Sequence, residues 1–249
     1  MEISRRSRLV ACILLMFGQW SVFTFVHADS VSAQNAVYQA AILSPARTDE
    51  DRKLDARRKP LQFLQFAQIE PGMKVLEVFA GGGATSELVA LAIGNTGMLW
   101  AQNEKASPAL ENRLAATPQP NLHPVARSFD DPVPDEARML DLVIINMNYH
   151  DIVNTPANRA AMNRHLFEGL KPGGHLLVID SAANPGKGLS ETNTLHRIEE
   201  ATVCEELSAA GFILEARSDY LGMPDDPRTE PFFKMGSPDD KFALRFLRK

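Results

Sequence analysis

The sequence predicts an α/β fold in which a doubly wound, mostly parallel sheet is covered by helices on both faces. Strand-like and helix-like segments alternate from Met73 to the C-terminus, and this order is typical of parallel sheets. Two of the strand segments, residues 140–145 and 174–179, are almost continuously apolar. Such a composition is expected of strands that are covered on both faces.

Seven segments have strand character within the predicted main domain, residues 71–249. They are residues 74–79, 98–101, 122–126, 140–145, 174–179, 212–216 and 242–247. The helices predicted between them cover residues 85–93, 108–116, 156–170 and 195–210. Ser107 and Pro108 supply an N-cap and a first-turn proline to the second of these helices, and Gly211 ends the fourth.

A helical lead-in is predicted for residues 29–70. Residues 36–43 have the pattern of a short apolar helix, and Thr48 with the acidic residues after it predicts a capped helix start. A basic stretch follows, made up of Arg52, Lys53, Arg57, Arg58 and Lys59. Two interpretations of this stretch stay open: a solvated helix face paired with nearby acids, or a lid over an anionic ligand.

Residues 1–28 have the organisation of a secretory signal peptide. A cluster of arginines precedes an apolar run over residues 9–26, and residues 26–28 form a small-x-Ala cleavage pattern. We therefore expect the protein to be exported, with the periplasm as its location. The alternative is an uncleaved helix that anchors the protein to the membrane, since about 18 apolar residues can just span a bilayer.

The composition excludes several classes of protein. Apolar residues make up 45% and charged residues 23% of the 249 residues, which argues against disorder and against a multi-span membrane protein. The net charge of -5 gives no electrostatic basis for binding nucleic acid. Because Cys12 and Cys204 are the only cysteines, neither a disulfide framework nor an all-cysteine zinc site is expected.

The most informative local feature is the glycine-rich turn Gly81-Gly82-Gly83, which follows the first predicted strand and precedes a helix. Glycines let the backbone turn sharply and let a ligand approach closely. The carboxylate of Glu77, at the end of the strand, suits a cationic amino acid tail better than a pyrophosphate. Phe79 stands where a dinucleotide-binding turn has its first glycine, so a nicotinamide-dependent oxidoreductase is a weaker alternative. The alternative that the glycines form a turn with a structural role alone also stays open.

This strand and turn resemble the first motif of the class I S-adenosylmethionine-dependent methyltransferases, which is a strand ending in acid-x-glycine-x-glycine-x-glycine. Glu77, Gly81 and Gly83 match the motif, and Phe79 departs from it at the first glycine. The resemblance implies that Glu77 and the turn hold the methionine part of a cofactor.

Two other segments carry the same resemblance. The Lys-Pro-Gly-Gly turn at residues 171–174 precedes the fifth strand, and residues 210–212 join a late helix to a strand. The likeness covers residues 61–249 and is strongest to a bacterial group of exported predicted methyltransferases with a Phe-x-Gly-Gly-Gly turn. It implies a seven-stranded, Rossmann-like sheet in which the last strand pair is antiparallel.

The resemblance also implies S-adenosyl-L-methionine as the cofactor. The second strand of such proteins ends in an acid that binds both ribose hydroxyls. Here that position falls at Asn103 or Glu104; Asn103 departs from the pattern, so Glu104 or a role shared by both is favoured. Asp130 stands where the family contacts the adenine amine, with Asp131 as a substitute, although both acids also suit an ordinary turn. The residues implied to hold the cofactor are Glu77, Phe79, Ala80, Gly81, Gly82, Gly83, Asn103, Glu104, Phe129, Asp130 and Asn146.

The candidate catalytic residues, Tyr149, His150 and Asp151, follow the fourth predicted strand. In several small-molecule O-methyltransferases a His-Asp pair follows the same strand, and its histidine removes the hydroxyl proton. His150 and Asp151 resemble that pair. The alternative is that His150 bonds a backbone carbonyl while Asp151 caps the next helix. The histidines and cysteines lack the spacing of a metal site, so no metal ion is expected.

Two further residues are secondary candidates. His196 opens the predicted helix 195–210 and reaches the substrate cleft in one interpretation, and Arg228 faces an anion from a proline-rich loop. Each also has an ordinary surface or packing interpretation.

We therefore expect S-adenosylmethionine-dependent methyl transfer to a small-molecule substrate, with an oxygen nucleophile as acceptor and His150 as general base. The alternative is a non-catalytic exported binding module that has kept the fold. It stays open because the cofactor is made in the cytoplasm, whereas residues 1–28 predict export.

Overall fold

The computed structural model describes residues 20–249 of the chain, with side chains from residue 31 onward. The chain divides into two compact units between Ala36 and Val37, and the unit Val37–Lys249 holds the sheet and every predicted site residue. The predicted leader, residues 1–28, lies largely outside the described residues, so its cleavage and the export that it implies stay predictions. Over residues 20–249, no helix is both long enough and apolar enough to cross a bilayer.

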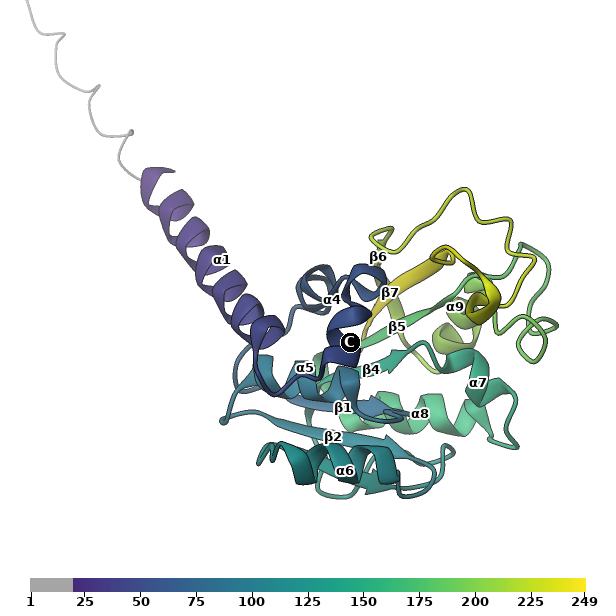
Figure 1. Cartoon of the computed structure of the whole chain (residues 1–249), viewed down its shortest axis with the longest axis horizontal. Helices are drawn as coiled ribbons and strands as arrows, with labels where there is room; N and C mark the ends of the chain where they lie inside the picture. Colours follow the sequence, from purple (N-terminus) through teal and green to yellow (C-terminus); the bar gives the residue numbers. More distant parts are fainter. Residues whose placement is uncertain (1–19) are drawn as a thin grey trace, which may run out of the picture. The chain divides into compact units, whose positions relative to one another are not determined.

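The unit Val37–Lys249 is built on one seven-stranded sheet (Figure 1). The strands are β1 (Lys74–Val78), β2 (Met98–Asn103), β3 (Leu122–Ala126), β4 (Leu140–Asn146), β5 (Leu170–Ser181), β6 (Ile213–Ser218) and β7 (Lys241–Leu247). Their order in the sheet is β3-β2-β1-β4-β5-β7-β6. β7 runs antiparallel to both β5 and β6, and the other neighbouring pairs are parallel. The predicted fold class, with its antiparallel last strand pair, is confirmed.

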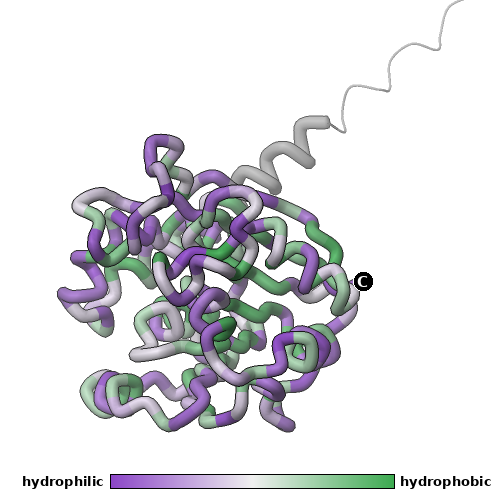
Figure 2. Tube along the Cα trace, turned by 90° about the vertical axis from the view of Figure 1, so that its right-hand side faces the viewer, coloured by the Kyte–Doolittle hydropathy of each residue, from purple (hydrophilic) through white to green (hydrophobic). Residues whose placement is uncertain are grey.

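Helices cover both faces of this sheet. α4 (Pro60–Ala67) and α5 (Ala84–Ile93) pack on one face, while α8 (Arg159–Gly169) and α9 (Glu200–Ala209) pack on the other. The remaining helical segments are α1 (Trp20–Leu43), α2 (Asp49–Lys53), α3 (Asp55–Arg58), α6 (Pro108–Ala116), α7 (Tyr149–Val153) and the 3₁₀ turn η1 (Phe232–Lys234). Figure 2 shows apolar segments in the interior of this unit and mostly hydrophilic loops around it.

The alternation of side chains along β1 determines which face of the sheet carries the site. Leu76 and Val78 are fully buried against the layer of α8 and α9, whereas Val75 is fully buried against the layer of α4 and α5. Because successive strand residues point to opposite faces, Glu77 shares the face of Val75. The carboxylate therefore lies on the side of the sheet that α4 and α5 cover.

One helix start and one short helix differ most clearly from the prediction. α9 begins at Glu200, and residues 195–199 belong to the loop before it. The cause is Arg197, whose fully buried guanidinium donates to the backbone carbonyls of Ala182 and Glu230 and so holds the loop away from a helix. The short helix α7 was not predicted, since its 5 residues are too few to show a helical period.

The Lys-Pro-Gly-Gly turn at the start of β5 requires glycine at Gly174 for steric reasons. A Cβ atom there would lie 2.9 Å from the carbonyl oxygens of Leu140 and Lys171, closer than real contacts allow. We expect Gly174→Ala to lower the free energy of unfolding by about 1–3 kcal/mol, because backbone atoms must shift to admit the methyl group. Urea unfolding measures this change.

Gly236→Ala is the matched control for this prediction. Nothing lies within 4 Å of a Cβ atom at Gly236, so the added methyl group meets no neighbour. We expect the control to leave the stability unchanged or to raise it by up to about 1 kcal/mol. Equal changes in the two variants would show that close packing around Gly174 is not what selects glycine.

Candidate functional site

A cavity of about 460 Å³ lies at the carboxyl ends of β1, β4 and β5. Glu77, Asn146 and Ile179 line it from these three strands. Residues of the glycine-rich turn, of the helices α2 to α7 and of the segment 220–241 add to the lining. Doubly wound sheets bind their ligands beyond the carboxyl ends of the strands, so this cavity is the candidate site.

Glu77 is the buried acid of the cavity, with 2% of its surface exposed. The hydroxyl group of Ser86, in α5, donates a hydrogen bond to its carboxylate. Burial raises the pKa of Glu77 to about 7, although Ser86 and the guanidinium of Arg58 oppose the rise. Near neutral pH the carboxyl group is therefore only partly ionised, and a cationic ligand beside it would stabilise the ionised form.

The glycine-rich turn is held in place by β2. Phe79 N donates to Gln102 Oε1 at 3.1 Å, and Ala80 N donates to the backbone carbonyl of Gln102 at 2.8 Å. The side-chain amide of Asn103 bonds Gly81 twice: Oδ1 accepts from Gly81 N at 2.8 Å, and Nδ2 donates to Gly81 O at 3.3 Å. These contacts order the turn without a ligand.

Two glycines of the turn meet different requirements. Gly81 has a φ of +58° and nothing within 4 Å of a Cβ position, so a ligand can approach its backbone. Gly83 has a φ of +80°, and a Cβ atom there would lie 2.5 Å from Leu110 Cδ1 in α6. Glycine at the first position leaves room for a ligand, and glycine at the second leaves room for α6.

The residues predicted to hold the nucleoside part of the cofactor lie outside the lining of this cavity; they are Asn103, Glu104, Phe129 and Asp130. Glu104 is exposed beyond the end of β2. The ring of Phe129 packs on that of Phe79, with centroids 5.0 Å apart. The carboxylate of Asp130 accepts from the backbone N–H of Asn158 at 2.6 Å. Contacts of these residues with the cofactor stay predictions.

His150 lies behind the cavity and does not line it. Only 1% of its surface is exposed. Its Nδ1 lies 2.6 Å from Asp180 Oδ1 at the end of β5, and its Nε2 lies 3.2 Å from Asp151 Oδ1. Burial lowers the pKa of His150, but the two carboxylates outweigh burial and raise it to about 10. The predicted role of His150 as the base that meets the acceptor is not supported by this geometry.

Asp151 is the member of the pair that lines the cavity. Its Oδ1 also lies 3.3 Å from Nδ1 of His196, which comes from the loop before α9. His196 thus lies beside Asp151 but does not itself line the cavity, and it comes from a loop with a φ of +53° and not from a helix start. Asn146 lines the same cavity, and its Nδ2 donates to Thr85 Oγ1 at 3.1 Å.

Tyr149 points away from the cavity and is fully buried. Its hydroxyl group donates to Glu206 Oε2 at 2.7 Å and accepts from Asn163 Nδ2 at 2.9 Å. Burial and the neighbouring Glu206 carboxylate raise the pKa of Tyr149. Its two partners belong to α9 and α8, so Tyr149 ties α7 to the helices of the opposite face. The structure contradicts its predicted catalytic role, because Tyr149 and Asp151 point in different directions from one short helix.

Solved structures with the same arrangement of strands identify the fold. A methyltransferase dependent on S-adenosylmethionine from Mesorhizobium loti aligns with a TM-score of 0.58 over 78% of this chain and 100% of that chain, at 14% sequence identity. A second one, from Aquifex aeolicus, aligns with a TM-score of 0.57 over 80% of this chain and 97% of that chain, at 18% identity. The fold is that of the class I S-adenosylmethionine-dependent methyltransferases.

A curated relative supports the assignment of the methyltransferase fold. The chain is 27% identical over 114 residues to the ubiquinone/menaquinone biosynthesis C-methyltransferase UbiE of Cupriavidus metallidurans. The alignment spans 46% of this chain and 45% of the relative, so the match covers less than half the length of either protein. No family model matches the sequence.

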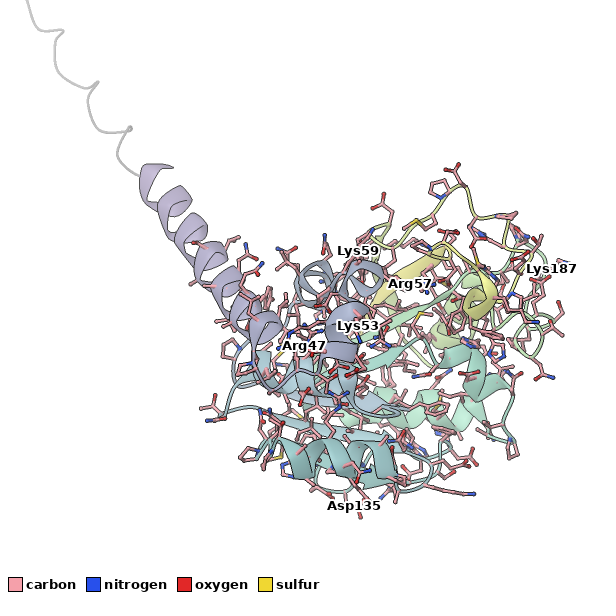
Figure 3. The ribbon with its side chains drawn as sticks, viewed as in Figure 1. Arg47, Lys53, Arg57, Lys59, Asp135 and Lys187 are labelled. Atoms are coloured by element: carbon pink, nitrogen blue, oxygen red, sulfur yellow. The ribbon has the colours of Figure 1, made fainter. Side chains whose placement is uncertain are left out.

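The basic stretch of the lead-in contributes two residues to the cavity of this methyltransferase fold. Arg57 and Arg58 line the cavity, which is what a lid over an anionic ligand requires. Arg52 instead donates to backbone carbonyls of the lead-in, and Lys53 pairs with Glu50 on the surface (Figure 3 shows Lys53 and Arg57). Within residues 31–249, no carboxylate lies at ion-pair distance from Arg58, which leaves its guanidinium available to an anionic group.

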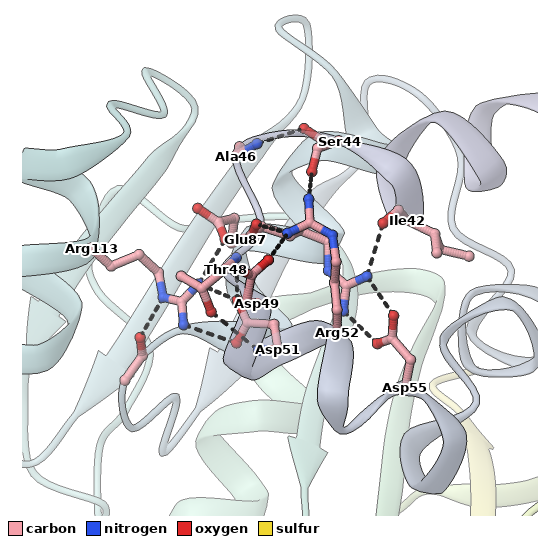
Figure 4. A network of polar contacts seen from close by, with 12 residues as sticks. Ile42, Ser44, Ala46, Thr48, Asp49, Asp51, Arg52, Asp55, Glu87 and Arg113 are labelled. Atoms are coloured by element: carbon pink, nitrogen blue, oxygen red, sulfur yellow. Dashed lines mark hydrogen bonds and ion pairs between the residues drawn. The ribbon is translucent and has the colours of Figure 1, made fainter.

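A network of polar contacts fastens α2 next to the glycine-rich turn (Figure 4). Arg113, from α6, contacts Asp51 at 2.6 Å and Glu87 at 2.7 Å. The Nε of Arg113 also donates to the backbone carbonyl of Gly82 at 2.9 Å. Thr48 and Asp51 form the capping box that the sequence predicts at the start of α2. One arginine therefore joins the lead-in, the turn and α5.

Sequence reasoning missed the part of the cavity that the C-terminal region supplies. The residues concerned are Tyr220, Leu221, Phe232, Asp239 and Lys241. No local motif marks them, because the fold alone brings them to the ends of the central strands. Arg228, the residue singled out in this region, donates to Asp240 Oδ2 at 2.5 Å and to Ala183 O at 3.0 Å. It does not line the cavity, which contradicts the interpretation that it faces a bound anion there.

Proposed function

We propose that the protein transfers a methyl group from S-adenosyl-L-methionine to a small-molecule acceptor. One observation carries the proposal: the buried Glu77 and the open turn at Gly81 meet inside one cavity at the carboxyl end of β1. The class I methyltransferase fold and the resemblance of this strand and turn to the first methyltransferase motif support it.

The residues of the cavity fit this cofactor in size and in charge. A volume of about 460 Å³ lies within the range of small-molecule sites. Glu77 offers a carboxylate to the ammonium group of the amino acid tail, and Arg58 offers a guanidinium to its carboxylate. Gly81 leaves the backbone of the turn open to a ligand, since nothing lies within 4 Å of its Cβ position.

The bound cofactor supplies an electrophilic methyl group on a sulfonium. The contribution of the chain is to hold the acceptor beside that group and to keep water away from it. Apolar side chains, among them Phe63 and Leu88, line part of the cavity, and Asn146 and Asp151 line its polar part. We propose an oxygen acceptor, because the Asp151 carboxylate can accept a hydrogen bond from a hydroxyl group.

Titration calorimetry with S-adenosylhomocysteine tests the proposal. We expect saturable binding of one ligand per chain and no comparable binding of NAD⁺. The absence of heat at millimolar S-adenosylhomocysteine, or a preference for NAD⁺, would contradict the proposed function.

The variant Gly81→Asn locates the binding to the turn. Asparagine tolerates a positive φ, but its side chain would occupy the open space beside the backbone. We expect the affinity for S-adenosylhomocysteine to fall by about tenfold or more, which corresponds to roughly 1.4 kcal/mol. Gly236→Asn, at another open glycine, is the control and is expected to bind as the wild type does.

A further inference from the structure

Three side chains beside the cavity bring imidazole nitrogen and carboxylate oxygen atoms together. His150 and Asp151 come from α7, and His196 comes from the loop before α9. Asp151 Oδ1 lies 3.2 Å from His150 Nε2 and 3.3 Å from His196 Nδ1. Within the described residues, the three ligand atoms all lie within 4.8 Å of one another.

These separations match those between neighbouring ligands of one metal ion. Imidazole nitrogen and carboxylate oxygen bind Zn²⁺ at about 2.0–2.2 Å, and tetrahedral or octahedral angles then put adjacent ligand atoms roughly 3.0–3.5 Å apart. The two distances at Asp151 fall in this interval without any change in the side chains.

The Nε2 atom of His150 is a buried ligand atom with no hydrogen-bond partner. Asp151 Oδ1 lies 3.2 Å away, but the two atoms are not aligned as a hydrogen bond. Only 1% of the residue is exposed, so this nitrogen is shielded from bulk solvent. A buried polar atom of this kind needs a partner, and a metal ion is a partner for an imidazole lone pair.

A carboxylate on the other side of the ring prepares His150 for metal binding. Asp180 is fully buried, and its Oδ1 lies 2.6 Å from His150 Nδ1. The backbone N–H groups of His150 and Ser181 donate to the same carboxylate at 2.9 and 2.8 Å. Metal-binding histidines usually donate their second ring nitrogen in this way, which fixes the orientation of the ring. A metal ion at Nε2 would displace the proton that the two carboxylates favour there.

His196 is anchored by its neighbour in the chain. The fully buried guanidinium of Arg197 lies 2.9 Å from Asp226 Oδ2 and donates to two backbone carbonyls. The ring of His196 packs against Phe233, with centroids 5.2 Å apart. These contacts hold the imidazole beside Asp151 and so pre-organise the cluster.

We propose that His150, Asp151 and His196 form a binding site for a divalent metal ion, Zn²⁺ or a metal of similar preference, next to the part of the cavity that Asp151 lines. Two imidazoles and one carboxylate suit Zn²⁺, Fe²⁺, Co²⁺ or Mn²⁺ better than Mg²⁺ or Ca²⁺, which prefer all-oxygen sites. Three protein ligands leave a coordination position free, as in catalytic zinc sites.

Asp151 lines the cavity, so a metal ion that it binds would be reached from there. A water molecule, or the hydroxyl oxygen of an acceptor, can bind a metal ion there and lose its proton more readily. This use of the site rests on the proposed methyl transfer, whereas the metal site itself rests on the three ligands alone.

Cobalt titration of the full-length, chelator-treated protein tests the site. We expect visible d–d absorption that saturates at one Co²⁺ per chain and that Zn²⁺ displaces. In His196→Asn the new residue tolerates the positive φ at this position. Both His196→Asn and Asp151→Asn are expected to weaken Co²⁺ binding by about tenfold or more. His165→Asn is the matched control, since His165 also lies near a carboxylate, 3.7 Å from Asp131 Oδ1, but outside the cluster.

The outcomes separate the metal site from methyl transfer. No saturable absorption at millimolar Co²⁺, or equal affinity in wild type and His196→Asn, would overturn the metal site and leave His150 as a cation held between two carboxylates. S-adenosylhomocysteine is titrated into the same samples. Its binding without a cobalt signal overturns the metal site alone, and a cobalt signal without its binding overturns the proposed function alone.

Discussion

Replacing Glu77 by glutamine is expected to make the protein more stable above pH 7 and to weaken its binding of S-adenosylhomocysteine. The stability effect follows from the pKa of Glu77, which burial raises from 4.5 to about 7. A carboxyl group of this kind supports folding fully below its unfolded pKa, and that contribution is lost as the pH rises through about 7. Glutamine stays neutral, so the Glu77→Gln variant does not lose this contribution to stability as the pH rises.

The size of this gain is large for one substitution. A shift from 4.5 to about 7 corresponds to about 3 kcal/mol at 1.36 kcal/mol per pH unit. We expect urea unfolding to show this difference at pH 8 and to show nearly equal stabilities at pH 4.5. Glu136→Gln, at an exposed position, is the control and should leave both values unchanged.

The same substitution is expected to change ligand binding in the opposite direction. The ionised carboxylate of Glu77 attracts an ammonium group, so affinity for S-adenosylhomocysteine in the wild type should rise as the pH increases through about 7. In Glu77→Gln the affinity should be about 10- to 100-fold lower at pH 8, because a charge-assisted hydrogen bond is lost. If the affinity of Glu77→Gln for S-adenosylhomocysteine still rises with pH, a group other than Glu77 controls binding.

Arg113→Met is expected to destabilise the protein by about 3–5 kcal/mol, the range for breaking a buried ion pair by removing one partner. Arg113 is the cation between Asp51 and Glu87, whose side chains are 6% and 1% exposed. Methionine fills much of the same volume but leaves both carboxylates without the guanidinium of Arg113. Because Arg113 also holds the carbonyl of Gly82, the variant should bind S-adenosylhomocysteine more weakly as well.

Arg138→Met is the control for this second prediction. Arg138 pairs with Asp135 at 3.6 Å, and both side chains are largely exposed, so the substitution should change the stability by less than about 1 kcal/mol. Urea unfolding of both variants, followed by calorimetry, measures the two effects. Similar stabilities for Arg113→Met and Arg138→Met would show that the lead-in is not fastened through Arg113.

Features encoded by neighbouring residues could be predicted from the sequence. The strands and most helices follow from the spacing of apolar residues, and the capping box at Thr48 follows from a four-residue pattern. The glycine-rich turn and Glu77 were also recognised locally, and the structure brings them to one cavity. Such features depend on contacts between residues that are close together in the sequence, so one sequence is enough to reveal them.

Features that depend on distant contacts could not be predicted in this way. Asp180 meets His150 across 30 residues, and Arg197 interrupts the expected helix start through a carbonyl 33 residues away. The direction of Tyr149 relative to Asp151 depends on how a short helix packs, which no pattern of five residues discloses. For the same reason the cluster of His150, Asp151 and His196 was not expected from spacing alone.

A crystal structure of the full-length protein with S-adenosylhomocysteine tests the central claim most directly. The claim is that the cavity between the glycine-rich turn and the lead-in helices holds the cofactor. We predict that the amino acid end of the ligand contacts Glu77 and Arg58 and that its chain passes along the backbone of Gly81. A ligand bound elsewhere, or an empty cavity at a saturating concentration, would contradict the claim.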